Sequence, residues 1–110
     1  MPSKTSPSGF EHQVLLPILR LDDGACTASI LTELEERTGR EVSAAAVLSA
    51  LRRLEAAGLL RSWLQTGSDR HERRTRRYVP VTPAGLRLVP EARRHLTRLW
   101  EGLPLPADRG

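Results

Sequence analysis

Apolar residues recur at helical spacing in the first half of the chain. The first such segment predicts a helix over residues 11–21, whose core-facing positions are Val14, Leu15, Ile18 and Leu19. Pro17 has no amide hydrogen to donate, so it must lie in the first turn of this helix or kink it. The Asp-Asp-Gly segment at 22–24 is expected to end the helix.

Two capping residues introduce the next two helices. Thr27 is a candidate N-cap for a helix that ends at Gly39 and has its core residues at Ile30, Leu31 and Leu34. Ser43 is the expected N-cap of a third helix, which a left-handed residue at Gly58 can close. The core positions of this third helix are Val47, Ala50 or Leu51, and Leu54. Its opposite face carries small residues first and arginines further along, namely Ala45, Ser49, Arg52, Arg53 and Ala56.

The periodicity changes after Gly58. Residues 59–66 and 75–81 are rich in the apolar, β-branched and aromatic residues typical of strands, and the segment 67–74 between them is polar and basic. This pattern predicts a β-hairpin with a long basic loop. Pro80 cannot donate to a β-ladder, so the second strand is an edge strand or ends there.

A fourth helix is expected from Thr82, an N-cap followed by Pro83 at the first helical position, to about Gly102. Its apolar residues are spaced alternately three and four apart, as in a coiled-coil seam: Val89, Ala92, Leu96, Leu99 and Leu103. Pro90 disfavours helix at the residue before it, so we expect a kink or a break at that point.

The order α-α-α-β-β-α defines a mainly α fold with a small β-hairpin, a winged helix-turn-helix with a C-terminal dimerisation helix. The 110 residues allow one compact unit. We expect flexible tails at 1–10 and 104–110, a winged helix-turn-helix domain at 11–81 and a dimerisation helix at 82–103. Such a fold serves recognition, with its third helix in the DNA major groove.

The charge balance agrees with a polyanionic partner. Lys and Arg total 17 against 13 Asp and Glu, for a net charge of +4, and every cation except Lys4 is an arginine. Arginine can grip a phosphate with two hydrogen bonds, although codon bias in a GC-rich genome also produces arginine. The predicted DNA contacts of the third helix are Ser43, Ala44, Ala45, Ser49, Arg52 and Arg53. Those of the hairpin are Arg70, Arg73, Arg74, Arg76 and Arg77, whose alternative interpretation is a solvated loop.

Catalytic and metal sites are not indicated. His12, His71 and His95 lie on separate predicted elements, and the glycines form no phosphate-binding loop, so no enzyme activity, metal or cofactor is expected. Glu33, Glu35 and Glu36 are interpreted as the solvated face of a helix rather than an acid–base pair. The single cysteine, Cys26, excludes an internal disulfide. With neither a membrane-length apolar run nor a signal peptide, the chain is expected in the cytoplasm and away from membranes.

Trp100 lies beside the seam of the last helix, next to Leu99. In a symmetric dimer it would meet its own copy or the partner's first helix, and packing of the interface is the interpretation we favour. The alternative is an apolar slot between paired rings that holds a flat aromatic ligand.

Several stretches resemble the PadR-like transcriptional regulators over roughly residues 14–100. The most specific are Ala-Leu-Arg-Arg-Leu-Glu at 50–55 leading to Gly58-Leu59, and Tyr78 followed by Thr-Pro-Ala-Gly at 82–85. This resemblance implies a bacterial repressor that dimerises through its C-terminal helix, often with help from the first helix, and binds a palindromic operator. It also implies that release by a small molecule is common.

The chain departs from the pattern of that family at two places. Members often carry Gly-Tyr where this chain has Thr27-Ala28, and a tyrosine followed by proline where it has Leu48-Ser49. Both tyrosines are typically at the DNA interface in the family. This chain therefore lacks two possible hydrogen bonds to phosphates, and the arginines of the loop would compensate for them. Two rival hypotheses follow: a module that binds an acidic protein, or an aromatic-ligand sensor with little DNA binding.

Overall fold

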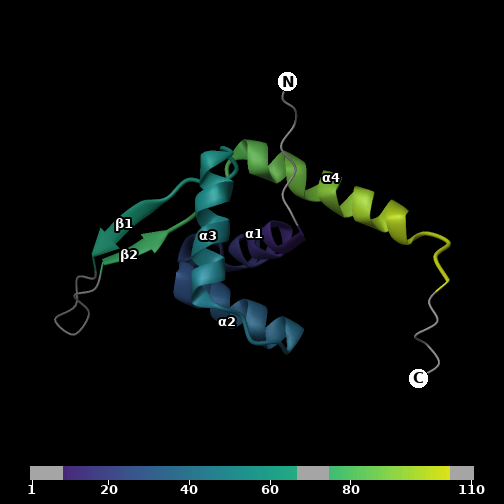
Figure 1. Ribbon diagram of the computed structural model, residues 1–110. Coiled ribbons are helices and arrows are strands. Elements are labelled where there is room, and N and C mark those ends of the chain that lie inside the picture. Colours follow the sequence, from purple (N-terminus) through teal and green to yellow (C-terminus); the bar gives the residue numbers. More distant parts are fainter. Residues whose placement is uncertain (1–8, 67–74, 105–110) are drawn as a thin grey trace.

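The computed structural model describes residues 9–66 and 75–104, except the side chains of 23 and 63–77 (Figure 1). The described elements are α1 (Gly9–Leu21), a 3-10 turn (Asp22–Gly24), α2 (Thr27–Thr38), α3 (Ala44–Ala56), β1 (Trp63–Thr66), β2 (Thr75–Tyr78) and α4 (Pro83–Trp100). The mainly helical fold is confirmed, and the described elements follow one another in the expected order. The expected tails, except for 9, 10 and 104, and the loop over 67–74 lie outside the described residues.

The core forms where α1, α2 and α3 pack against one another. The stripes predicted from helical spacing supply it, with Val14, Leu15, Ile18, Ile30, Leu34, Val47, Ala50, Leu51 and Leu54 all buried. Two predicted core residues are not fully buried: 38% of Leu19 is exposed in the single chain, and Leu31 is half-buried against the core. Each fully buried Val, Leu or Ile stabilises the fold by roughly 1.5–3 kcal/mol, so this three-helix core is the main source of stability.

The first helix begins two residues earlier than its sequence suggests and ends at the predicted residue, Leu21. It starts at Gly9, and Phe10 packs against the core although the sequence places it in a tail. Pro17 lies in the middle of α1 rather than in its first turn, and the helix continues past it to Leu21. Pro17 is buried, so its ring contributes apolar contact where it gives up a backbone hydrogen bond.

The N-cap of α2 is Cys26, one residue before the predicted Thr27. The Ser29 hydroxyl accepts from the Cys26 N–H at 2.9 Å and donates to the Gly24 carbonyl at 2.8 Å. Ser29, a residue within the first turn of α2, therefore stabilises the start of the helix through the backbone of the residues before it. The prediction of Thr27 as the cap was wrong.

Both ends of α3 are as the sequence predicts. Ser43 is the N-cap, and its Oγ accepts from the Ala46 N–H at 3.2 Å. At the other end Gly58 adopts φ 78°, a left-handed conformation that favours glycine.

The strands β1 and β2 pair antiparallel, with Trp63 opposite Tyr78 and Thr66 opposite Thr75. The second strand ends before Pro80, as predicted. The strand pair is joined to the helices by the Val79 N–H, which donates to the Ala25 carbonyl at 3.0 Å just before α2.

The start of α4 is fixed to the end of α3 through Thr82. Its Oγ1 donates to the Gly58 carbonyl at 2.7 Å and accepts from the Gly85 N–H at 3.1 Å, while its own N–H donates to the Leu59 carbonyl at 3.0 Å. Gly85 is buried in this junction, where the first turn of α4 comes close to the backbone at Leu59.

Beyond this junction α4 extends away from the body of the molecule (Figure 1). The helix is continuous from Pro83 to Trp100, so the break considered at Pro90 does not occur. Gly85 is its one buried residue, and Leu88 and Val89 pack partly against the core. None of the described helices is both long and apolar enough to cross a membrane.

We predict that Gly85→Ala lowers the free energy of unfolding by about 1–3 kcal/mol, because the added methyl group would overlap the Leu59 carbonyl and the Val81 side chain. The matched control is Gly24→Ala, whose methyl group would meet no atom within 4 Å and should change stability by less than about 0.5 kcal/mol. Thermal unfolding of both variants followed by circular dichroism is the measurement. Equal stability of the two variants would contradict the close packing at Gly85.

Candidate nucleic-acid interface

The face of α3 opposite the core is open to solvent. Val47, Ala50 and Leu54 point inward, and all the residues predicted for DNA contact on this helix are exposed, namely Ser43, Ala44, Ala45, Ser49, Arg52 and Arg53. Figure 1 shows α3 lying across α1 and α2, with β1 and β2 extending from one side. We call these six residues the α3 outer face.

The beginning of α3 is suited to an anion. Its first turn contains no acidic residue, and Ser43 satisfies only the Ala46 N–H of the free amides at this end. The helix dipole adds positive potential at the same place, which favours a phosphate group. The alanines at 44 and 45 leave the backbone accessible.

The turn that leads into α3 is held by side chains of α2. Glu35 Oε2 accepts from the Val42 N–H at 3.0 Å, and Thr38 Oγ1 accepts from the Arg40 N–H at 3.3 Å. Glu35 is half-buried and bonded in this turn, so it does not belong to a solvated face as predicted. Glu33 makes an exposed ion pair with Arg37 at 2.9 Å, one turn along the same helix. The orientation of α3 relative to α2 thus depends on a carboxylate that the sequence pattern did not identify.

Arg53 has a partner within the protein. Its Nε donates to Glu11 Oε2 of α1 at 2.6 Å, while 58% of the Arg53 side chain stays exposed. Arg52 has no ion pair among the described residues and is fully available. The two neighbouring arginines therefore differ, and only a pairing across helices, invisible in local sequence, distinguishes them.

The predicted basic loop is described only at its end. Arg76 and Arg77 lie in β2, opposite Gln65 and Leu64 of β1. Arg70, Arg73 and Arg74 lie outside the described residues. Their part in binding stays a prediction.

The predicted dimer seam on α4 is largely uncovered. Leu96, Leu99, Trp100 and Leu103 are each at least half exposed, and Leu99 reaches 74%. Val89 and Ala92 are half-buried, and Val89 packs against the core of its own chain.

The groups considered for catalysis are dispersed. His12 lies on α1 and His95 is exposed on α4, while His71 lies outside the described residues. Cys26 is buried and forms no disulfide. Among residues 9–66 and 75–104 no three His, Cys, Asp or Glu side chains lie close enough to hold a metal ion.

Comparison with known proteins agrees with this geometry. No protein-family model and no curated protein matches the sequence. A PadR family transcriptional regulator from Eggerthella lenta has a similar structure, with a TM-score of 0.67, 28% identity, and coverage of 81% of this chain and 75% of that chain. A PadR family regulator from Clostridium difficile gives a TM-score of 0.68 at 19% identity, over 83% of this chain and 91% of that one.

A third similar structure is that of Bacillus subtilis PadR in complex with operator DNA, with a TM-score of 0.66 at 14% identity. The match covers 90% of this chain and 51% of that one. The first two of these solved proteins are described as transcriptional regulators. The resemblance carried by the sequence motifs agrees with these matches, because the fold of the chain is similar to that of PadR family regulators.

Replacing Glu35 tests the connection between α2 and α3. We predict that Glu35→Ala lowers the free energy of unfolding by about 1–3 kcal/mol, because the Val42 N–H would be left without its charged acceptor. Amide hydrogen exchange at Val42 should become at least tenfold faster. Glu36→Ala is the control, because Glu36 is exposed and has no side-chain partner within the described part of the chain. Unchanged exchange at Val42 in the Glu35 variant would show that the carboxylate does not hold the turn.

Proposed function

We propose that this protein is a transcriptional repressor that binds a palindromic DNA operator as a homodimer in the cytoplasm and has no enzymatic activity. The observation that carries the proposal is the α3 outer face, a solvent-exposed surface with small residues and arginines and no acidic residue in its first turn. It occurs in a fold shared with PadR family regulators, one of which was solved on operator DNA.

In this proposal α3 lies in the major groove. A helix with its side chains is about 10–12 Å across and the groove is about 12 Å wide. Ala44 and Ala45 allow close approach at the anion-favouring end, Ser49 supplies a hydroxyl group, and Arg52 reaches a phosphate. Leu48 is 37% exposed beside them, where the family often has a tyrosine, so it offers apolar contact to a thymine methyl group instead of a hydrogen bond.

The basic loop and β2 add sequence-independent affinity. Arg70, Arg73, Arg74, Arg76 and Arg77 would follow the phosphates that flank the groove, as the wing of a winged helix-turn-helix does. Their charges would replace the hydrogen bonds of the two missing tyrosines.

The last helix joins two copies. A single α4 leaves Leu96, Leu99, Trp100 and Leu103 exposed in heptad-like register, and a second α4 would cover them. Val89 and Ala92 complete the seam nearer the body. We favour a role for Trp100 in packing this interface. In the alternative, a flat aromatic ligand binds between the paired Trp100 rings and causes release of DNA.

We predict that Arg73, Arg74 and Arg76 replaced together by alanine weaken binding to every duplex tested. The logarithmic slope of affinity against salt should flatten by about 0.9 for each phosphate that the variant no longer neutralises. Fluorescence anisotropy with random and selected duplexes over a salt series measures both effects. Wild-type affinity and slope in the triple variant would show that this loop is not a phosphate clamp.

Leu99→Ser should weaken the dimer at least tenfold, since burial of each leucine contributes roughly 1.5–3 kcal/mol and the substitution removes one from both copies. Leu86→Ser is the matched control, because Leu86 is a 50% exposed leucine on α4 outside the heptad seam. Sedimentation velocity over a concentration series gives the dissociation constants. Equal dimerisation of the two variants would place the interface elsewhere.

Glu11→Gln should increase affinity for DNA about two- to fivefold, because it frees the Arg53 guanidinium for a phosphate. The gain should vanish in the Arg53→Gln background, which separates release of Arg53 from the change in net charge. A gain that persists in that background would show that Arg53 does not contact DNA. Anisotropy with one duplex at one salt concentration is sufficient.

A further inference from the structure

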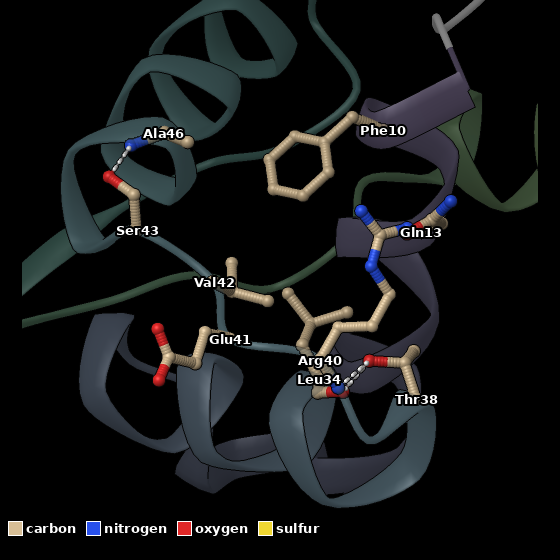
Figure 2. A pocket seen from close by; sticks show the side chains of 9 residues that line it. All are labelled: Phe10, Gln13, Leu34, Thr38, Arg40, Glu41, Val42, Ser43 and Ala46. Carbon is tan, nitrogen blue, oxygen red and sulfur yellow. Dashed lines mark hydrogen bonds between the residues drawn. The ribbon is translucent and has the colours of Figure 1, made fainter.

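A pocket lies at the base of α3, between the start of α1, the end of α2 and the turn that joins α2 to α3 (Figure 2). Its volume is about 360 Å³, within the range of roughly 300–1,000 Å³ of small-molecule sites. It lies on a different part of the molecule from the seam of α4, and it shares only Ser43 with the α3 outer face.

The apolar wall of the pocket comes from three elements. Phe10 of α1, Leu34 of α2, and Val42 with Ala46 at the base of α3 line it. Leu34 is buried and the other three are half-buried, so the wall continues the hydrophobic core outward. Such a surface suits the apolar body of a small molecule.

Two polar side chains of the pocket have no partner among the residues that the structure describes. Within the described residues, neither the Arg40 guanidinium nor the Gln13 side-chain amide makes a hydrogen bond or an ion pair. Figure 2 shows Arg40 extending past Leu34 in the direction of Gln13, while the Glu41 carboxylate points away from both. A free guanidinium beside an apolar wall recognises a planar carboxylate through two parallel hydrogen bonds.

We propose that this pocket binds a small organic acid, with its carboxylate on Arg40 and Gln13 and its apolar body against Phe10, Leu34 and Val42. The pocket also includes the cap of α3, because Ser43 and Ala46 both line it and are joined by the bond from the Ala46 N–H to Ser43 Oγ. Occupancy therefore alters the first turn of α3 and reduces DNA binding. This second statement rests on the proposed function.

The binding site is tested without DNA, by ¹H–¹⁵N NMR of the full chain with cyclohexanecarboxylate as the probe. We expect saturable shifts at the amides of Phe10, Gln13, Val42 and Ala46. Cyclohexanecarboxamide, which lacks the charge, should bind at least tenfold more weakly, and inorganic phosphate, which lacks the apolar body, should cause no such shifts. Shifts confined to other residues, or equal binding of phosphate, would overturn the proposal.

Two variants test whether the carboxylate of the ligand contacts Arg40 and whether its apolar body occupies the pocket. Arg40→Gln should lower the affinity for cyclohexanecarboxylate at least tenfold and leave that for the carboxamide unchanged; Arg40 is exposed and has no side-chain partner in the described part, so the fold should persist. Ala46→Leu should fill the pocket and weaken both probes. Arg87→Gln, an exposed arginine on α4 that does not line the pocket, is the control and should bind as wild type. Equal affinity of the Arg40 variant for the carboxylate would overturn the assignment.

Coupling to DNA is tested separately. Saturating cyclohexanecarboxylate should weaken binding to duplex DNA at least threefold in the wild-type chain and leave the affinity of Arg40→Gln unchanged. Unaltered DNA affinity in the wild type would overturn the coupling. A chain that binds the probe but no DNA at any salt concentration would contradict the proposed function and leave the ligand site standing.

Discussion

Burial of one side of α3 is the constraint on which the rest of the structure depends. Val47, Ala50 and Leu54 are almost completely buried against α1 and α2. Because burial of each Val or Leu stabilises the fold by roughly 1.5–3 kcal/mol, a rotation of α3 that exposed these residues would be strongly unfavourable. Because a helix has a fixed period, burial of this side requires that 44, 45, 49 and 52 face outward. The surface that we propose for DNA contact is thus a consequence of the core.

The helix α4 is held differently from the first three helices, because it buries almost none of its own residues. It is attached at one end, where Thr82 bonds to the end of α3 and Gly85 lies against Leu59, and then leaves the body with its leucines exposed. A helix of this kind needs another surface to cover it. In the homodimer that we propose, this attachment would make the surface that covers α4 determine the spacing of the two α3 outer faces.

Elements and caps could be predicted from the sequence wherever the determinants are local. Ser43 and Gly58 act on residues within a turn or so of themselves, as Thr82 does where it caps the Gly85 N–H. Helical spacing alone identified the inward residues of α2 and α3. The features that were missed are pairings across the fold: Glu35 with the Val42 amide, Arg53 with Glu11, and Phe10 on the core. Helical periodicity predicts which side of a helix faces the core, but it does not predict which group on another element a polar side chain contacts.

The central claim is that the α3 outer face, set by the buried side of the same helix, is the surface that meets DNA. NMR titration of the ¹⁵N-labelled chain with a short duplex tests it most directly. The account predicts that the largest shifts, with a midpoint that moves with salt, fall on the amides of 44–49 and 52. Shifts concentrated on α4 with those amides unmoved would contradict it.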